Sequence, residues 1–243
     1  MIDLRQGDCL EIMKDIPDGA IDLILCDLPY GTTACKWDNI IPFEPLWAQY
    51  NRIIKDNGAI VLFGSEPFST KLRYSNLKMF RYDWIWRKPQ GTNFLNAKVH
   101  PLKNHETISV FSKKRAVYNP QMTMGKPYKA KTGGSSEIYG KSILSRTDNK
   151  GTRYPLSVQE FNAVGSNKRL HPTQKPVELL EYLIKTYTNE GETVLDNCMG
   201  SGSTGVACVN TNRNFIGIEL EEKYFNIAKE RIGETKRQWK INA

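Results

Sequence analysis

A carboxylate, a proline and an aromatic ring follow an apolar run near the N-terminus, in the segment Asp27-Leu28-Pro29-Tyr30. An Asp that closes a buried strand points into the crevice at the carboxyl edge of an α/β sheet, where ligands bind. Pro29 favours an extended Leu28 and so leaves its carbonyl free of any helix. Together the carboxylate and this carbonyl could accept both hydrogens of an NH2 group, and Tyr30 offers a flat face for a base. Taken alone, the segment also fits a plain strand end followed by a proline turn.

Such a pair of acceptors suits chemistry on the amino group of a nucleobase. An exocyclic aromatic amine is a poor nucleophile because its lone pair is delocalised into the ring. Two acceptors that hold both N–H bonds favour a more pyramidal nitrogen, and Asp27 would stabilise the positive charge that develops as this nitrogen takes up a methyl group. In a duplex the base must first be flipped out, and a stacking aromatic such as Tyr30 partly offsets the lost stacking.

A glycine-rich turn at residues 199–205 follows a strand-like segment and has the spacing G-x-G-x-x-G, with Glu219 placed 19 positions after Gly200. In this arrangement the glycines let the backbone approach a nucleotide-like ligand, and the acid binds ribose hydroxyls. Asp196, just before the turn, would repel a pyrophosphate but attract the α-ammonium of S-adenosylmethionine. Only 24 of the 243 residues follow Glu219, too few for the remaining strands of a dinucleotide fold, which disfavours a nicotinamide dehydrogenase.

Positive charge is concentrated in the middle of the chain. The net charge is +8, but residues 87–170 contain 16 Lys and Arg against 4 Asp and Glu. This concentration favours a polyanionic partner, although a basic surface kept for solubility is the alternative. The five scattered cysteines show no zinc-type spacing, so we expect no metal and no disulfides. No apolar run is long enough to span a bilayer and no signal peptide is visible, so we expect no membrane partner and a cytoplasmic location.

Strand-like and helix-like segments alternate in residues 1–86 and again in residues 171–243, which favours a mostly parallel α/β sheet. Between them the chain is polar, and a loop of this length is uncommon in a compact domain unless it has a function. We therefore divide the chain into residues 1–112, a basic region 113–170 and residues 171–243. The predicted strands are 2–5, 20–27, 59–64, 82–86, 105–112, 193–197 and 214–220, and the predicted helices are 9–15, 43–56, 66–79, 177–188, 203–210 and 221–232, with Asn57-Gly58 ending the second helix.

These motifs together resemble the amino-methyltransferases of DNA, specifically the permuted group called the β class. Asp27-Leu28-Pro29-Tyr30 looks like the family's catalytic Asp-Pro-Pro-Tyr motif, with a leucine where proline is usual. Residues 171–176 look like its segment beside the methionine part of the cofactor, and residues 196–202 look like its cofactor loop. Glu219 looks like its ribose-binding acid. Gly7-Asp8-Cys9 looks like the segment that contacts the adenine ring of the cofactor, with Asp8 as the partner of its amino group.

The resemblance implies a Rossmann-like, S-adenosylmethionine-dependent methyltransferase fold: a seven-stranded, mostly parallel sheet, circularly permuted and entered at its third strand, with a target-recognition region at 113–170. Residues 1–112 would form the catalytic half and residues 171–243 the cofactor-binding half. The implied catalytic residues are Asp27, Leu28, Pro29 and Tyr30, and the implied cofactor-binding residues are Asp8, Cys9, Asp27, Thr173, Lys175, Asp196, Cys198, Gly200, Ser201, Gly202, Ser203 and Glu219.

The implied activity is site-specific methylation of adenine N6 in double-stranded DNA, after base flipping. In this class an Asp at the first motif position is associated with adenine and a Ser with cytosine N4, and the association is loose enough to leave N4-cytosine methylation open. A methyltransferase of RNA or of a protein amide is a further alternative, as is a catalytically silent DNA-binding module. A homodimer and a cognate restriction endonuclease also stay open as partners.

Overall fold

Apolar, largely β-branched residues form the centre of an eight-stranded sheet in the computed structural model, which describes residues 1–33, 35, 38–136 and 140–242. All six residues of β2 (Ile21–Cys26) are buried, as expected for a strand covered on both faces. Among the described strands of this sheet, β5 alone runs antiparallel to its neighbours. In sheet order the strands are β1 (Ile2–Gln6), β12 (Asn214–Glu219), β11 (Thr193–Asp196), β2, β3 (Ile54–Gly64), β5 (Lys103–Phe111), β4 (Phe80–Thr92) and β10 (Val158–Glu160).

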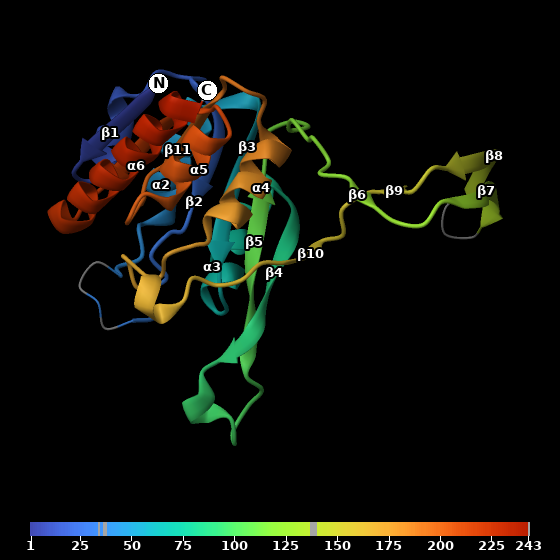
Figure 1. The fold of residues 1–243 in the computed structure, drawn as a ribbon, viewed down its shortest axis with the longest axis horizontal. Coiled ribbons are helices and arrows are strands. Elements are labelled where there is room, and N and C mark those ends of the chain that lie inside the picture. The colour runs from blue at the N-terminus through green and yellow to red at the C-terminus, as the bar shows by residue number, and fades with distance from the viewer. Residues whose placement is uncertain (34, 36–37, 137–139, 243) are drawn as a thin grey trace. The chain divides into compact units, whose positions relative to one another are not determined.

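Helices cover both faces of this sheet, and each face has its own hydrophobic cluster. In Figure 1, α4, α5 and α6 lie in front of the sheet, and their apolar residues pack into one cluster, as Leu179 and Leu183 of α4 illustrate. The second cluster includes residues of α2 and α3 such as Tyr50 and Phe68. The helices are α1 (Cys9–Ile12), continued by a 3-10 helix (Met13–Asp15), α2 (Phe43–Ile53), α3 (Phe68–Ser75), α4 (Val177–Tyr187), α5 (Ser203–Asn210) and α6 (Glu222–Asn242).

The order of the strands confirms the permuted, mostly parallel sheet. The first strand of the chain, β1, pairs in parallel with the last, β12, so the N-terminal residues supply the strands that are missing after Glu219. The seven expected strands are all present, and the short strand β10 adds to the far edge beside β4. Because β2, β3, β4 and β11 are parallel to one another, their carboxyl ends lie at the same edge of the sheet.

One turn prediction was wrong. Asn57-Gly58 does not end a helix, because α2 already ends at Ile53 and both residues belong to β3. A Cβ on Gly58 would lie only 2.8 Å from the carbonyl oxygen of Asp22, so the glycine permits close approach to the neighbouring strand. Gly58 is therefore needed for packing between strands, although in the sequence the pair Asn57-Gly58 looks like a turn.

Strand β4 extends well past the predicted segment 82–86, whereas β5 stays close to the predicted segment 105–112, and the two strands form a long hairpin. The hairpin carries a short 3-10 helix, Phe94–Asn96, near its tip. Because β4 is parallel to β2, this tip projects from the edge of the sheet that also carries Asp27.

Residues 120–156 form a compact unit of their own, distinct from the unit formed by residues 1–119 and 157–243. Four strands that the sequence analysis did not identify lie in it. Their residues are mostly Lys, Thr, Ser and Gly, so they lack the alternation that marks a strand packed on a core. The unit lies inside the predicted region 113–170, of which residues 137–139 are outside the described residues. Here β6 (Thr123–Met124) pairs with β9 (Thr152–Arg153), and β7 (Tyr128–Ser136) pairs with β8 (Gly140–Asn149).

Candidate active site

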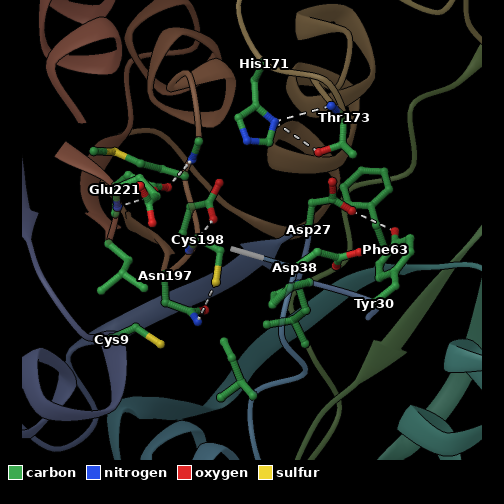
Figure 2. A pocket seen from close by; sticks show the side chains of 18 of the residues that line it. Cys9, Asp27, Tyr30, Asp38, Phe63, His171, Thr173, Asn197, Cys198 and Glu221 are labelled. Carbon is green, nitrogen blue, oxygen red and sulfur yellow. Dashed lines mark hydrogen bonds between the residues drawn. The ribbon is translucent and has the colours of Figure 1, made fainter. Parts of the chain in front are cut away.

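Core packing fixes the predicted catalytic motif at the carboxyl end of β2. Leu28 is only 3% exposed and belongs to the hydrophobic cluster around α2, which holds the backbone on either side of it. The Tyr30 hydroxyl donates a hydrogen bond to Asp27 Oδ1 at 2.7 Å (Figure 2). The Tyr30 ring stacks on Phe68, with centroids 4.8 Å apart and an angle of 25° between the planes. The carboxylate and the ring are therefore presented as one rigid group.

Asp38 organises the segment that follows this motif. Its carboxylate accepts hydrogen bonds from the backbone amides of Gly31, Thr32 and Thr33 at 2.9, 2.9 and 2.7 Å. Burial would raise the pKa of Asp38, but the hydrogen bonds from Thr33 and from these amides hold it below its ordinary value. The sequence analysis missed this residue, because an Asp that closes a loop seven residues long has no local signature.

A lysine from the predicted methionine-side segment contacts the Asp27 carboxylate. Lys175 Nζ is 2.5 Å from Asp27 Oδ2 and 3.4 Å from Glu106 Oε2. Glu106 of β5 also pairs with Lys88 of β4, at 2.5 Å between Nζ and Oε1. Lys175 is 7% exposed, so this contact lies out of bulk water. Asp27, Lys175, Glu106 and Lys88 thus form one chain of alternating charges, to which the sequence analysis contributed only Asp27 and Lys175.

The charges in this chain shift one another. Burial raises the pKa of Asp27 above its ordinary value, against the opposing effect of the Lys175 ammonium. Burial would lower the pKa of Lys175, but the carboxylates of Asp27 and Glu106 raise it. The Lys175 and Lys88 ammonium groups hold the pKa of Glu106 below its ordinary value despite burial. Lys175 is therefore an ammonium shared unequally by two carboxylates.

The glycine-rich turn connects β11 to α5 and is held by two buried acids. Asp196 accepts hydrogen bonds from the Thr204 hydroxyl at 2.6 Å and from the Cys198 amide at 3.1 Å. Glu219 accepts one from the Gly200 amide at 2.8 Å, and Gly200 has a φ of +51° that favours glycine. Burial raises the pKa of Asp196 to about 6 and also raises that of Glu219. Both acids can accept further hydrogen bonds from a ligand, because each carboxylate oxygen has two lone pairs.

The segment after β1 reaches the same cavity from the other side. Asp8 caps α1, and its Oδ1 accepts a hydrogen bond from the Leu10 amide at 2.7 Å. Interaction with the Cys198 thiol and burial raise the pKa of the Cys9 thiol far above its ordinary value, and the pKa of Cys198 is raised as well. These thiols are therefore protonated and serve as small apolar wall residues.

One cavity of about 410 Å³, a volume typical of small-molecule sites, extends from the segment Asp27–Tyr30 to the glycine-rich turn. Gly202 does not line it. Instead, a Cβ on Gly202 would lie 2.9 Å from Ala228 Cβ, so this glycine permits packing against α6. The predicted residues that line the cavity are Asp8, Cys9, Asp27, Leu28, Pro29, Tyr30, Thr173, Lys175, Asp196, Cys198, Gly200, Ser201, Ser203 and Glu219.

Further lining residues were not predicted as site residues, among them Phe63, Asn197 and His171. Phe63 lies next to the last residue of β3, and Lys175 Nζ is 5.1 Å from the centroid of its ring. Asn197 accepts a hydrogen bond from the buried Tyr50 hydroxyl at 2.5 Å. Burial and the nearby Lys175 lower the pKa of His171 to about 4, so the ring is neutral at pH 7. In the sequence His171 and Asn197 stood inside segments that resemble the family's cofactor motifs, whereas Phe63 looked like an ordinary strand residue.

The donor set fits S-adenosylmethionine. Acidic groups at the turn, Asp196 and Glu219, suit an α-ammonium and ribose hydroxyls, and apolar side chains such as Leu10 and Leu220 suit an adenine ring. Asp27 and Tyr30 lie at the other end of the same cavity, where a second substrate can meet the cofactor. Among the described residues, no group of three or more His, Cys, Asp or Glu side chains could hold a metal ion. In that part of the chain no helix is long and apolar enough to cross a membrane.

A family of proteins described as DNA methylases, of the N6 and N4 type, has a sequence model that matches residues 21–230. The chain belongs to this family. The Type II methyltransferase M.HpaI of Haemophilus parainfluenzae is 30% identical over 244 residues, which cover 93% of the chain and 72% of that relative. M.HinfI of Haemophilus influenzae, also a Type II methyltransferase, is 30% identical over 268 residues, covering 96% and 68%.

Solved structures agree with this assignment. The crystal structure of the M1.HpyAVI-SAM complex matches with a TM-score of 0.66 and 28% identity, over 96% of this chain and 99% of that one. The cytosine-N4-specific PvuII DNA methyltransferase matches with a TM-score of 0.68 over 98% and 92%, but its identity of 16% shows the fold alone. The chain is thus a DNA amino-methyltransferase whose cofactor is S-adenosylmethionine.

Proposed function

We propose that this DNA methyltransferase methylates N6 of adenine at a specific sequence in double-stranded DNA, after flipping the base into the cavity beside Tyr30. The observation that carries the proposal is the contact between Asp27 Oδ2 and a nitrogen donor, the Lys175 ammonium, at 2.5 Å. The same oxygen can accept a hydrogen bond from an N–H group of an exocyclic amine. The association of Asp with adenine in the β class favours adenine over cytosine.

S-adenosylmethionine, when bound, supplies an electrophilic methyl group and leaves as a thioether. Asp27 and the Leu28 carbonyl each accept a hydrogen bond from one N–H group of the target amine. These hydrogen bonds concentrate the lone pair of the amine on its nitrogen. The Asp27 carboxylate then stabilises the positive charge on the methylated nitrogen. The nitrogen finally loses one proton, and Asp27 Oδ2 is placed to accept it because burial raises the pKa of this carboxyl.

The second part of the proposal concerns the DNA. Residues 87–170 contain 16 Lys and Arg against 4 Asp and Glu, which suits the phosphate backbone. We assign target recognition to the region 113–170 and the rim of the site to the β4–β5 hairpin. A homodimer and a cognate restriction endonuclease remain predictions from the family resemblance.

The test is to incubate the protein with unmethylated bacterial DNA and labelled S-adenosylmethionine, digest the DNA to nucleosides and identify the product by mass. We expect N6-methyladenine, and we expect Asp27→Ala to lose it while calorimetry shows retained cofactor binding. Asp83→Asn is the matched control, since it removes a carboxylate from an ion pair with Arg73 whose side chains are 38% and 22% exposed. N4-methylcytosine would overturn the base assignment, and no methylated nucleoside would refute the proposal.

A further inference from the structure

Both oxygens of the catalytic carboxylate already have partners. Asp27 Oδ1 accepts a hydrogen bond from the Tyr30 hydroxyl, and Oδ2 accepts one from Lys175 at 2.5 Å. A target amino group that binds Oδ2 must therefore compete with the Lys175 ammonium. If the ammonium stayed, it would neutralise Asp27 and repel the positive charge that develops on the target nitrogen.

Glu106 offers the displaced ammonium another place. Its Oε2 is buried and, among the described residues, has no hydrogen-bond partner, although Lys175 Nζ lies only 3.4 Å away. A charge-assisted hydrogen bond is about 2.8 Å long, so Nζ needs to move by less than about 1 Å to form one. The movement would exchange one ion pair for another and leave no buried charge unpaired.

The strands hold Glu106 in place for this exchange. Glu106 is opposite Trp86 in the β4–β5 register, and its Oε1 is occupied by Lys88 at 2.5 Å. Lys88 Nζ in turn lies 4.6 Å from the centroid of the Trp86 ring. One oxygen of Glu106 is thus fixed to the sheet, while the other faces Lys175.

We propose that Glu106 is a positioning residue that takes over the Lys175 ammonium when the target amino group binds Asp27. In the resting protein Lys175 neutralises the buried Asp27, and during methylation it pairs with Glu106 and leaves the charge of Asp27 for the reacting nitrogen. The inference rests on the proposed function, because it concerns the entry of an amino group into that site.

The test is a double-mutant cycle with Glu106→Gln and Lys175→Met, measured as kcat for DNA methylation at saturating cofactor and DNA. Glu106→Gln keeps the shape of the side chain but removes the charge that would receive Lys175. We expect kcat to fall about 10- to 100-fold, the range of a hydrogen bond to a charged group, with cofactor affinity unchanged. In the Lys175→Met background the same substitution should lower kcat no further.

Asp83→Asn, on the neighbouring strand β4, controls for the loss of a carboxylate and should keep the wild-type kcat. The positioning role is refuted, while the proposed function stands, if Glu106→Gln keeps the wild-type kcat. It is refuted equally if Glu106→Gln lowers kcat by the same factor in the Lys175→Met background as in the wild type. A wild-type protein that methylates no DNA refutes both.

A second measurement does not depend on the folding of any variant. In a crystal structure of the wild-type protein with cofactor analogue and its target duplex, Lys175 Nζ should lie closer to Glu106 Oε2 than to Asp27 Oδ2. The reverse order with the base in place would overturn the inference.

Discussion

The affinity for S-adenosylmethionine should depend on pH through Asp196. This carboxyl is 4% exposed, and burial raises its pKa to about 6 although hydrogen bonds from Thr204 and Cys198 oppose the shift. Its proposed role is to pair with the α-ammonium of the cofactor, which requires the ionised form. Below pH 6 the free protein holds a proton on Asp196 that must leave before the cofactor binds. Affinity is therefore full above pH 7 and is lost as the pH falls through 6.

The size of the effect follows from the same value. Each pH unit below the pKa weakens the binding free energy of the cofactor by about 1.4 kcal/mol. At pH 5 the dissociation constant should therefore be about tenfold above its value at pH 7 and higher. Isothermal titration calorimetry with S-adenosylmethionine between pH 5 and 8 measures this directly. Asp196→Asn keeps the shape of the side chain but cannot ionise, so its affinity should be weaker at pH 7.5 and flat across the range.

Other titrating groups in the cavity need to be separated from Asp196. The pKa of Asp27 is raised by burial, and Asp27→Ala tests its share. Burial and Lys175 place the pKa of His171 at about 4, so its titration falls below the range. The pKa of Glu219 is also raised by burial, and Glu219→Gln tests its share. A wild-type affinity that is constant between pH 5 and 7, or a pH dependence that survives in Asp196→Asn, would refute the assignment of Asp196 to the ammonium.

Two further predictions concern packing and DNA. Gly205→Ala should lower the free energy of unfolding by about 1–3 kcal/mol in urea denaturation, because the new Cβ would overlap the Ile232 side chain and lie 2.8 Å from Phe215 Cε1. As its control, Gly233→Ala in α6 has its nearest neighbour at 3.7 Å and should instead stabilise by up to about 1 kcal/mol; equal effects at the two sites would contradict the argument. At the hairpin tip Phe94 is 77% and Leu95 83% exposed, and residues 87–105 contain four Lys or Arg and no Asp or Glu. Replacing both apolar residues by Ser should weaken DNA binding by about tenfold or more, from the apolar area they would otherwise bury, with cofactor affinity unchanged. Fluorescence anisotropy with labelled duplex measures this, and an unchanged affinity would exclude the tip from the DNA interface.

The sequence was sufficient where function lies directly beside a buried strand. Asp27 and Asp196 each end or follow an apolar strand, and because parallel strands bring their carboxyl ends to one edge, both acids line the same cavity. The glycine-rich turn was also visible locally. Its glycines, however, differ in role: Gly200 faces the cavity, whereas Gly202 permits packing against α6. Sequence spacing cannot separate these roles, since both need a positive φ.

Contacts between distant segments could not be predicted in this way. Lys175 and Asp27 are 148 positions apart, and Glu106 and Lys88 belong to a hairpin whose length the sequence understated. In the sequence, Glu106 is one acid within a basic segment and looks like a solvent-exposed charge. Only the antiparallel pairing of β4 with β5, next to β3, brings it to Lys175. The side chains that set the charge of a site are therefore harder to find than those that touch the ligand.

Leu28 shows how a departure from the family pattern is accommodated. A proline at this position would fix φ through its ring and so direct the carbonyl that we assign to the target amino group. Leu28 has no such ring, but its side chain is 3% exposed and packs in the cluster around α2. A buried side chain restrains the backbone that carries it, because moving the carbonyl would pull the leucine out of the core. The leucine thus secures by packing what the proline secures by covalent geometry, and the acceptor pair of Asp27 and residue 28 is retained.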